Sequence, residues 1–322
     1  MTIAWVVGQG GMLGGAVAHA IDADPRRRWR LIRQPGLPWG DDGAFAAAVD
    51  AGLEALRDAV SAAAGEDWAI VWVAGAAVTA ATAAQVAREL AQFRLFCERV
   101  AAVFDAELLA RGCLFYSSSA GGVYGGSTNP PFTEETEPAP ISLYGRFKLD
   151  AEQLAVCLTA SGCRVLVGRI TNLYGPGQKL GKLQGLISHL AKAQLSPKPA
   201  TIFVPVETVR DYIFVDDCAR LLLDALDRLL GCPPGTGVTK ILGSGRGTSI
   251  ADLLGQFRQI EKRRPNAMLG YSAQAALQGL DLRMRSVVWP ELDHRELTPL
   301  AAGIGATMDD VLLQVQHPDG VR

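Results

Sequence analysis

The sequence predicts an α/β fold in which a doubly wound parallel sheet carries helices on both faces. Two observations lead to this prediction. Short apolar runs alternate with longer amphipathic segments through the first half of the 322-residue chain, and a glycine-rich turn directly follows the first apolar run. Strands that are apolar along their whole length are buried on both faces, as in a parallel sheet covered by helices.

The expected strands are short, apolar and rich in β-branched and aromatic residues. They cover residues 3–8, 29–33, 68–75, 113–119, 164–170 and 210–217. The expected helices are longer and place apolar residues three and four positions apart. They cover residues 12–24, 45–65, 85–112, 144–161, 218–230 and 249–262. After about residue 171 prolines and glycines become frequent, so we expect a smaller α/β lobe in the C-terminal part.

The composition is that of an ordinary globular protein, with 49% hydrophobic and 20% charged residues. A formal net charge of −2 excludes a general electrostatic attraction to nucleic acid or to anionic membranes. We interpret the basic clusters at 26–30 and 262–264 as solvated faces at the ends of elements. Residues 68–87 carry no charge over a length that could span a membrane, but a buried strand followed by a small-residue loop explains them better.

The cysteines and the start of the chain predict a cytoplasmic protein. The six cysteines form no CxxC pair and have no histidine partner at metal-ligand spacing, so we expect reduced thiols and no metal site. The first apolar run begins at residue 3 and leads straight into glycines, a pattern unlike that of a secretory signal peptide.

The glycine-rich turn predicts dinucleotide binding of the Rossmann type. Gly8, Gly11 and Gly14 form a G-x-x-G-x-x-G pattern between a strand and a helix. Such glycines allow a tight turn, a close approach of the backbone to a pyrophosphate, and a helix N-terminus that points at it. The alternative is a merely flexible turn, but the position after the first strand favours a cofactor. The expected cofactor contacts are Gly8, Gly10, Gly11, Met12, Leu13 and Gly14.

The end of the second strand bears on the choice between NAD and NADP. A cofactor with a free ribose 2′-hydroxyl usually meets an Asp or Glu about 20 residues after the glycines. Here the strand ends in Ile32, Arg33 and Gln34, without an acid. Arg33 suits a 2′-phosphate and so favours NADP over NAD; a surface arginine that closes a strand is the alternative.

Tyr144 and Lys148 are four residues apart in an expected helix, so their side chains lie on one face within reach of each other. The spacing alone decides little, because chance produces such pairs. Three hydroxyls, Ser117 to Ser119, end the strand at 113–119, at the edge of the sheet where ligands bind. The serines therefore lie where a substrate would bind, and the spacing leaves open whether Tyr144 and Lys148 transfer a proton there.

Together, these features resemble the extended short-chain dehydrogenase/reductase superfamily, and within it the NAD(P)-dependent sugar-nucleotide epimerase/dehydratase family. The matching motifs are the glycine turn at 8–14, VAGAA at 73–77, SSSAGGVYG at 117–125, YGRFK at 144–148, RITNLYGPGQ at 169–178, VRDYIFVDD at 209–217 and ILGSGRGTSIADLL at 241–254. They fall in the family's order over residues 3–255, which makes the resemblance specific.

The resemblance implies a site in which Ser119, Tyr144 and Lys148 are catalytic. A phenol with an ordinary pKa of about 10 is a poor base near neutral pH, and an adjacent ammonium favours the phenolate. The tyrosine would exchange a proton with a sugar hydroxyl, and the serine would orient that oxygen. Ser118 stays open as an alternative to Ser119, because the following loop is one residue longer than the common pattern.

The resemblance also implies further contacts with cofactor and substrate. The implied cofactor contacts are Ala74, Gly75, Ser117, Tyr144, Lys148 and Thr171. The implied contacts with a nucleoside diphosphate sugar are Ser119, Asn172 and Arg210. The planar guanidinium of Arg210 suits a phosphate, although an ion pair with Asp211 or Asp216 is the alternative.

Two larger features follow from the resemblance. The Rossmann domain would comprise residues 1–172, with 209–238 returning to it, and the substrate-binding lobe would comprise 173–208 and 239–322. Members of the family often form homodimers through the helices that would be 85–112 and 144–161 here.

The reaction expected first is epimerisation at C4 of the sugar, by oxidation, rotation of the keto sugar and re-reduction. Ala120 and Gly121 follow Ser119 where 4,6-dehydratases place an Asp-Glu pair, so dehydration is disfavoured. An NADP-dependent reductase of a keto sugar or another carbonyl is the alternative, supported by Arg33. A sensor that binds NAD(P) without catalysis is a third alternative, against which the intact Ser-Tyr-Lys set speaks.

Overall fold

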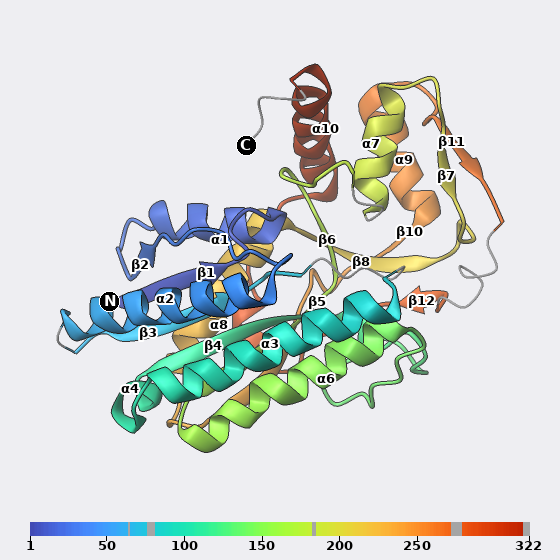
Figure 1. Cartoon of the computed structure of the whole chain (residues 1–322). Coiled ribbons are helices and arrows are strands. Elements are labelled where there is room, and N and C mark those ends of the chain that lie inside the picture. Colours follow the sequence, from blue (N-terminus) through green and yellow to red (C-terminus); the bar gives the residue numbers. More distant parts are fainter. Residues whose placement is uncertain (64, 76–80, 182–184, 272–278, 318–322) are drawn as a thin grey trace.

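The larger part of the computed structural model is built around a six-stranded parallel sheet (Figure 1). The structure describes all residues except 64, 76–80, 182–184, 272–278 and 318–322, so part of the VAGAA motif at 73–77 lies outside the described residues. The strands are β1 Thr2–Val7, β2 Trp29–Ile32, β3 Asp67–Trp72, β4 Gly112–Ser119, β5 Arg164–Ile170 and β9 Gly237–Leu242. Their order is β2-β1-β3-β4-β5-β9, and every pairing is parallel. The predicted doubly wound parallel sheet is therefore confirmed.

Helices cover both faces of this sheet, because alternate strand residues point to opposite sides. One face packs against α2 Asp42–Ser61, α3 Ala83–Val103 and α6 Leu143–Cys157, and the other against α1 Met12–Asp22 and α8 Val215–Leu230. Trp72 and Tyr116 belong to the first core, and Phe115 belongs to the second. Each face therefore has a hydrophobic core of its own.

The predicted helix 85–112 is wrong as one element, because it is two helices. α3 ends at Val103, and α4, Ala106–Ala110, begins after Asp105. The Asp105 carboxylate accepts a hydrogen bond of 2.8 Å from the Leu108 amide. This bond caps the new helix, and aspartate is more favourable at an N-cap than inside a helix.

The predicted strand 210–217 is too long at its C-terminal end. β8 covers Val209–Phe214, and α8 begins at Val215. Asp216 and Asp217 lie in the first turn of α8, where the partial positive charge of the helix N-terminus favours acidic residues.

A smaller lobe lies beyond one end of the sheet, with α7, α9 and α10 grouped together (Figure 1). Its elements are β6 Asn172–Tyr174, α7 Leu186–Gln194, β7 Ala200–Ile202, β8, β10 Gly247–Ser249, α9 Ile250–Glu261, β11 Ala267–Leu269, β12 Asp281–Leu282 and α10 Leu300–Gln316. β8 pairs with β6, β10 and β12, whereas β7 pairs with β11. Tyr174, Phe214, Phe257 and Ile304 belong to the core of this lobe.

Two pairings bear on the expected domain boundaries. Residues 209–238 are expected to return to the Rossmann domain. Within them, β8 lies in the sheet of the smaller lobe, while α8 packs against the main sheet. β9 pairs with β5 as far as Leu242, beyond the expected boundary at 238. The division of the chain into two domains stays a prediction.

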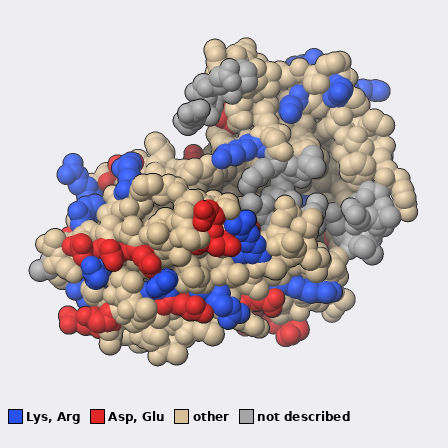
Figure 2. Space-filling view, viewed as in Figure 1, with Lys and Arg blue, Asp and Glu red and all other residues tan. Residues whose placement is uncertain are grey.

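Charged side chains of both signs alternate over the face of the molecule that α2, α3 and α6 form (Figure 2). Exposed ion pairs join α3 to α2: Arg88 lies 3.0 Å from Asp42, and Arg99 lies 3.4 Å from Asp50. Water screens such pairs, so they contribute little to stability.

Three observations concern the other predictions from composition. All six cysteines are free. In the ranges that the structure describes, no group of His, Cys, Asp and Glu side chains could hold a metal ion. No helix in those ranges is both long and apolar enough to cross a membrane.

The turn between β1 and α1 is tight enough to require glycine at two positions. Gly8 has a φ of 99°, and a Cβ there would lie 2.7 Å from the Ala74 amide nitrogen. A Cβ on Gly14 would lie 2.2 Å from the Gly8 carbonyl oxygen, to which the Gly11 amide donates a hydrogen bond of 2.9 Å. The turn thus joins the ends of β1 and β3 to the start of α1.

Gly14→Ala should lower the free energy of unfolding by at least about 2 kcal/mol, because the new methyl group would collide with a backbone carbonyl that cannot move freely. Gly10→Ala is the matched control, since no atom lies within 4 Å of its Cβ position, and it should change stability by less than about 1 kcal/mol. Urea denaturation followed by circular dichroism measures both variants. Equal stabilities would contradict the packing assigned to Gly14.

Asp105→Ala should lower the free energy of unfolding by about 1 kcal/mol, because α4 loses its N-cap. Asp105→Asn keeps an acceptor oxygen at the same place and should retain most of the stability. The same denaturation experiment compares the two. An equal loss in both variants would show that capping is not the role of Asp105.

Candidate active site

The carboxyl ends of β1, β3, β4 and β5 meet at one edge of the main sheet, beside the smaller lobe (Figure 1). Ligands of open parallel sheets bind at this edge. α1 begins there at Met12, and its N-cap Gly11 has no side chain to occupy the free amides of the first helical turn. These amides can therefore bind an anionic group.

Small residues border this edge on the β3 side. Ala74 is buried and packs against Gly8, so the backbone after β3 approaches the turn closely. A Cβ on Gly75 would lie 2.8 Å from Glu89 Oε1. The predicted contact at Leu13 is limited to the backbone, because its side chain packs into the core under α1.

A loop that the sequence analysis quoted but assigned no role lies against the start of α1. A Cβ on Gly177 would lie 3.6 Å from Met12 Cα. The Gly177 amide donates a hydrogen bond of 3.0 Å to the Asp310 carboxylate of α10. The only sequence signal for this contact was the Gly-Pro-Gly at 175–177, which shows a sharp turn but not its neighbour.

Lys148 lies in α6 and is buried at the end of β4. Its ammonium donates hydrogen bonds to the Ser117 carbonyl oxygen at 3.0 Å and to the Tyr116 hydroxyl at 3.4 Å. It also lies 5.7 Å from the centre of the Tyr144 ring. Burial lowers the pKa of Lys148, but the oxygens of Tyr116, Tyr144 and Glu89 outweigh burial and raise the pKa overall. The side chain therefore stays charged beside Tyr144.

Ser119 and Tyr144 border the same glycine. Ser119 ends β4 and caps the short helix α5, Ala120–Val123, by accepting a hydrogen bond of 3.2 Å from the Gly122 amide. A Cβ on Gly122 would lie 3.2 Å from Ser119 Oγ and equally close to Tyr144 Cε1. The Ser119 hydroxyl and the Tyr144 ring thus border the same position, which has no side chain.

Ser118 points elsewhere. It is 5% exposed, and its hydroxyl donates a short hydrogen bond to the buried Glu152 carboxylate of α6. Of the two serines that the sequence left open, the geometry therefore favours Ser119 as the one beside Tyr144.

Arg33 directly follows β2 and is exposed. Its guanidinium forms an ion pair of 2.5 Å with Asp22 at the end of α1, and 61% of its side chain remains accessible to solvent. An exposed pair of this kind is weak, so a bound phosphate can replace Asp22.

Thr171 and Asn172 follow β5, and both attach to Asp211 of β8. Thr171 Oγ1 donates a hydrogen bond of 3.0 Å to the Asp211 carboxylate, and Asn172 Nδ2 donates one of 3.0 Å to the Asp211 backbone carbonyl. Burial raises the pKa of Asp211, while hydrogen bonds from Ser244, Thr171 and Gly245 favour the charged form. The Thr171 hydroxyl thus has a partner within the protein, whereas Asn172 is exposed.

Arg210, also in β8, is 8% exposed. Its Nη1 donates hydrogen bonds of 2.9 Å to the carbonyl oxygens of Val209 and Gly279, and burial lowers its pKa. The guanidinium is therefore held at the junction of β8 and the segment before β12. Its role as a phosphate ligand stays a prediction.

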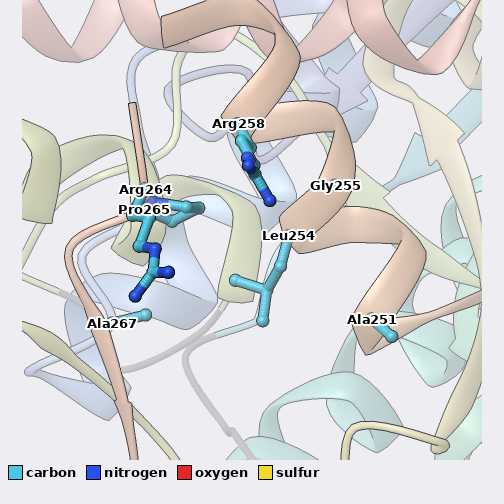
Figure 3. A pocket seen from close by; sticks show the side chains of 7 residues that line it. All are labelled: Ala251, Leu254, Gly255, Arg258, Arg264, Pro265 and Ala267. Carbon is cyan, nitrogen blue, oxygen red and sulfur yellow. The ribbon is translucent and has the colours of Figure 1, made fainter. Parts of the chain in front are cut away.

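A separate hollow of about 430 Å³ lies in the smaller lobe between α9 and the segment that leads into β11 (Figure 3). Its lining comprises Ala251, Leu254, Gly255, Arg258, Arg264, Pro265 and Ala267. Arg264 is exposed there, as expected for the basic cluster at 262–264. No residue of the predicted site lines this hollow, so the sheet edge is the candidate active site.

Comparisons with known proteins identify the family. The model of the "NAD dependent epimerase/dehydratase family" matches residues 4–235. UDP-glucose 4-epimerase 4 of Oryza sativa subsp. japonica is 31% identical over 181 residues, which cover 51% of this chain and 48% of that protein. For two other curated relatives the covered share is 34% and 48%, so the chain spans about half or less of the length of these three relatives.

Solved structures share the fold at lower identity. UDP-glucose 4-epimerase of Thermotoga maritima, solved with UDP-glucose, has a TM-score of 0.77 at 20% identity, over 98% of this chain and 100% of that one. RMD of Pseudomonas aeruginosa, solved with NADPH, has a TM-score of 0.75 at 22% identity, over 97% and 98%. Because the family match covers more than half of the chain, the protein belongs to the NAD dependent epimerase/dehydratase family of extended short-chain dehydrogenase/reductase enzymes.

Proposed function

We propose that the protein is an NAD(P)-dependent epimerase that acts at C4 of a nucleoside diphosphate sugar. The observation that carries the proposal is the buried Lys148 ammonium beside Tyr144, with Ser119 bordering the same tyrosine across Gly122. The structural neighbour from Thermotoga maritima is a UDP-glucose 4-epimerase solved with UDP-glucose, which supports this class of substrate.

The residues at the sheet edge fit a dinucleotide. The turn has no room for a Cβ on Gly8 or Gly14, and the first amides of α1 are free of a side-chain cap. The proposed cofactor site comprises Gly8, Gly10, Gly11, Met12, Leu13, Gly14, Arg33, Ala74, Gly75, Ser117, Tyr144, Lys148 and Thr171. When bound, the nicotinamide supplies a hydride acceptor and, after oxidation of the sugar, a hydride donor.

The chain's own residues handle the proton. Ser119 Oγ donates a hydrogen bond to the sugar 4-oxygen and holds it near Tyr144. The Tyr144 phenolate takes the proton of the 4-hydroxyl as the C4 hydride leaves, and it returns this proton after the keto sugar has rotated. Lys148 stabilises the phenolate through its charge. Asn172 and Arg210 hold the diphosphate, so that the sugar can turn without leaving the site.

The purified protein should interconvert two C4 epimers of a nucleoside diphosphate sugar without added dinucleotide, because the hydride returns to the substrate.

Tyr144→Phe should lower kcat at least about 100-fold while dinucleotide affinity changes little, because the variant loses only the proton carrier. Tyr271→Phe, at a side chain that is 87% exposed, is the matched control. Coupled sugar-nucleotide assays and calorimetry give the two readouts, and unaltered turnover would remove Tyr144 from the mechanism.

An NADP-dependent reductase of a keto sugar or another carbonyl is the second candidate. The exposed Arg33 at the end of β2 favours it, because its weak pair with Asp22 leaves the guanidinium available to a 2′-phosphate. A reductase consumes one NADPH for each product, whereas the epimerase consumes none. Dinucleotide binding without either turnover would indicate a sensor that binds NAD(P) without catalysis.

Arg33→Ala should weaken NADP binding by about tenfold, because one hydrogen bond to a charged group is lost. NAD binding should change by less than about twofold, since NAD has no 2′-phosphate. Arg30→Ala, at the neighbouring exposed arginine of β2, is the matched control. Calorimetric titration measures the affinities of both variants for NAD and NADP. An equal loss of affinity for the two dinucleotides would show that Arg33 does not bind the 2′-phosphate.

We also propose a cytoplasmic homodimer in which α3 and α6 of two copies pack together. Two features support this. The outer face of α6 exposes Leu143 and Val156, and the outer face of α3 exposes small residues such as Ala91 and Ala101 that allow helices to approach closely. The six free cysteines suit a reducing compartment.

A further inference from the structure

A buried ion pair lies one helical turn beyond Lys148. Glu152 of α6 is 6% exposed and Arg169 of β5 is 7% exposed. Arg169 Nη2 lies 2.7 Å from Glu152 Oε2, and Arg169 Nε lies 3.1 Å from Glu152 Oε1. Two parallel hydrogen bonds between these planar groups fix both the distance and the relative orientation of α6 and β5.

Two hydroxyl groups extend the pair to further elements. Ser118 of β4 donates a hydrogen bond to Glu152 Oε1. Arg169 Nη1 donates a hydrogen bond of 2.6 Å to the hydroxyl of Tyr124, the residue that ends α5, and its guanidinium lies 5.1 Å from the Tyr124 ring centre. We call these four residues the Glu152 network.

The elements that the Glu152 network joins also carry the candidate catalytic groups. Lys148 and Tyr144 lie four and eight positions before Glu152, on the same face of α6. Ser119 directly follows Ser118, and α5 carries Gly122, which borders both Ser119 and Tyr144. The network therefore connects the strand that carries the serine to the helix that carries the tyrosine.

We propose that the Glu152 network is a positioning device that sets the distance between Ser119 on β4 and the Tyr144–Lys148 pair on α6. This inference rests on the proposed proton-transfer role of Tyr144. Stability alone is a weak reason for the network, because apolar residues can often replace a buried ion pair without loss of stability. Positioning needs directional bonds, which apolar packing does not provide.

A second ion pair, which has a buried lysine and a half-buried aspartate, serves as an internal control. Lys240 of β9 is fully buried and donates hydrogen bonds of 2.7 Å to Asp293 and 2.8 Å to Ser286 Oγ. The Ser286 hydroxyl also donates to the Glu134 carboxylate at 2.6 Å. β9 is the outer strand of the sheet and carries none of the candidate catalytic groups. Ser286→Ala thus removes a hydroxyl from a half-buried network at a different place.

Ser118→Ala should lower kcat by about tenfold with a nearly unchanged KM, because small errors of position slow proton transfer more than they weaken substrate binding. The acid limb of the pH–kcat profile should move to higher pH. β4 holds the Lys148 ammonium through the Ser117 carbonyl oxygen, so a displaced β4 moves this charge away from the Tyr144 phenol and stabilises the phenolate less. Ser286→Ala should change neither kcat nor the position of the acid limb. A Ser118→Ala variant with the wild-type profile, or an equal shift in Ser286→Ala, would overturn the proposal.

A second measurement needs no substrate. The absorbance of tyrosinate is followed as the pH is raised, in the wild type and in Ser118→Ala. Each titration is repeated on the same protein carrying Tyr144→Phe, and subtracting the second curve from the first isolates the Tyr144 phenol. Ser118→Ala should move this difference titration to higher pH, and an unmoved titration contradicts the network's role. Absence of turnover on nucleoside diphosphate sugars by the wild type would sink the proposed function alone, because the titration still decides the network.

Variants of the ion pair itself are a less direct test, because an uncompensated buried charge destabilises the fold. Glu152→Gln keeps the shape and the acceptor oxygen but removes the charge. If it folds by circular dichroism, it should show the same shift of the acid limb as Ser118→Ala. A folded Glu152→Gln variant with the wild-type profile would count against positioning.

Discussion

A buried ammonium is the group on which the rest of the candidate site depends. Taking the charge of Lys148 out of water is unfavourable unless other groups replace its hydration. The Ser117 carbonyl oxygen does so at 3.0 Å, and the rings of Tyr116 and Phe147 lie 5.1 Å and 5.3 Å from the ammonium. The contacts with Ser117 and Tyr116 require α6 to sit in one register against the end of β4. The need to satisfy this charge therefore also fixes the place of Tyr144, one turn earlier.

The sheet, and the residues proposed for the site, could be predicted from the sequence because they depend on local patterns. Apolar runs, the glycines of the β1–α1 turn, and the four-residue spacing of Tyr144 and Lys148 are all visible within a few residues. The choice between Ser118 and Ser119 was not visible, because it depends on which side of β4 each hydroxyl faces. The break at Asp105 is a local signal too, but it lay inside a long amphipathic pattern that masked it.

The remaining features depend on contacts between distant parts of the chain. Ser118 and Glu152 are 34 residues apart, and Thr171 and Asp211 are 40 apart, so no single-sequence pattern links them. The same holds for β8, whose sequence reads as a strand but does not show which sheet it joins. Arg210 illustrates the limit of a motif, since its match to a phosphate ligand carried no sign of the backbone carbonyls that it contacts.

The contact between α10 and the loop at 175–178 has a consequence for folding. Asp310 holds Gly177 against Met12, and Gln314 donates a hydrogen bond of 3.2 Å to the Gln178 carbonyl. The loop beside the first helix is thus secured by a helix synthesised almost 300 residues later. During translation, the turn after β1 can form early from local residues, but the hydrogen bonds between α10 and the loop at 175–178 can form only after α10 has been synthesised. The contacts between this loop and α10 therefore form late, however early β1 folds.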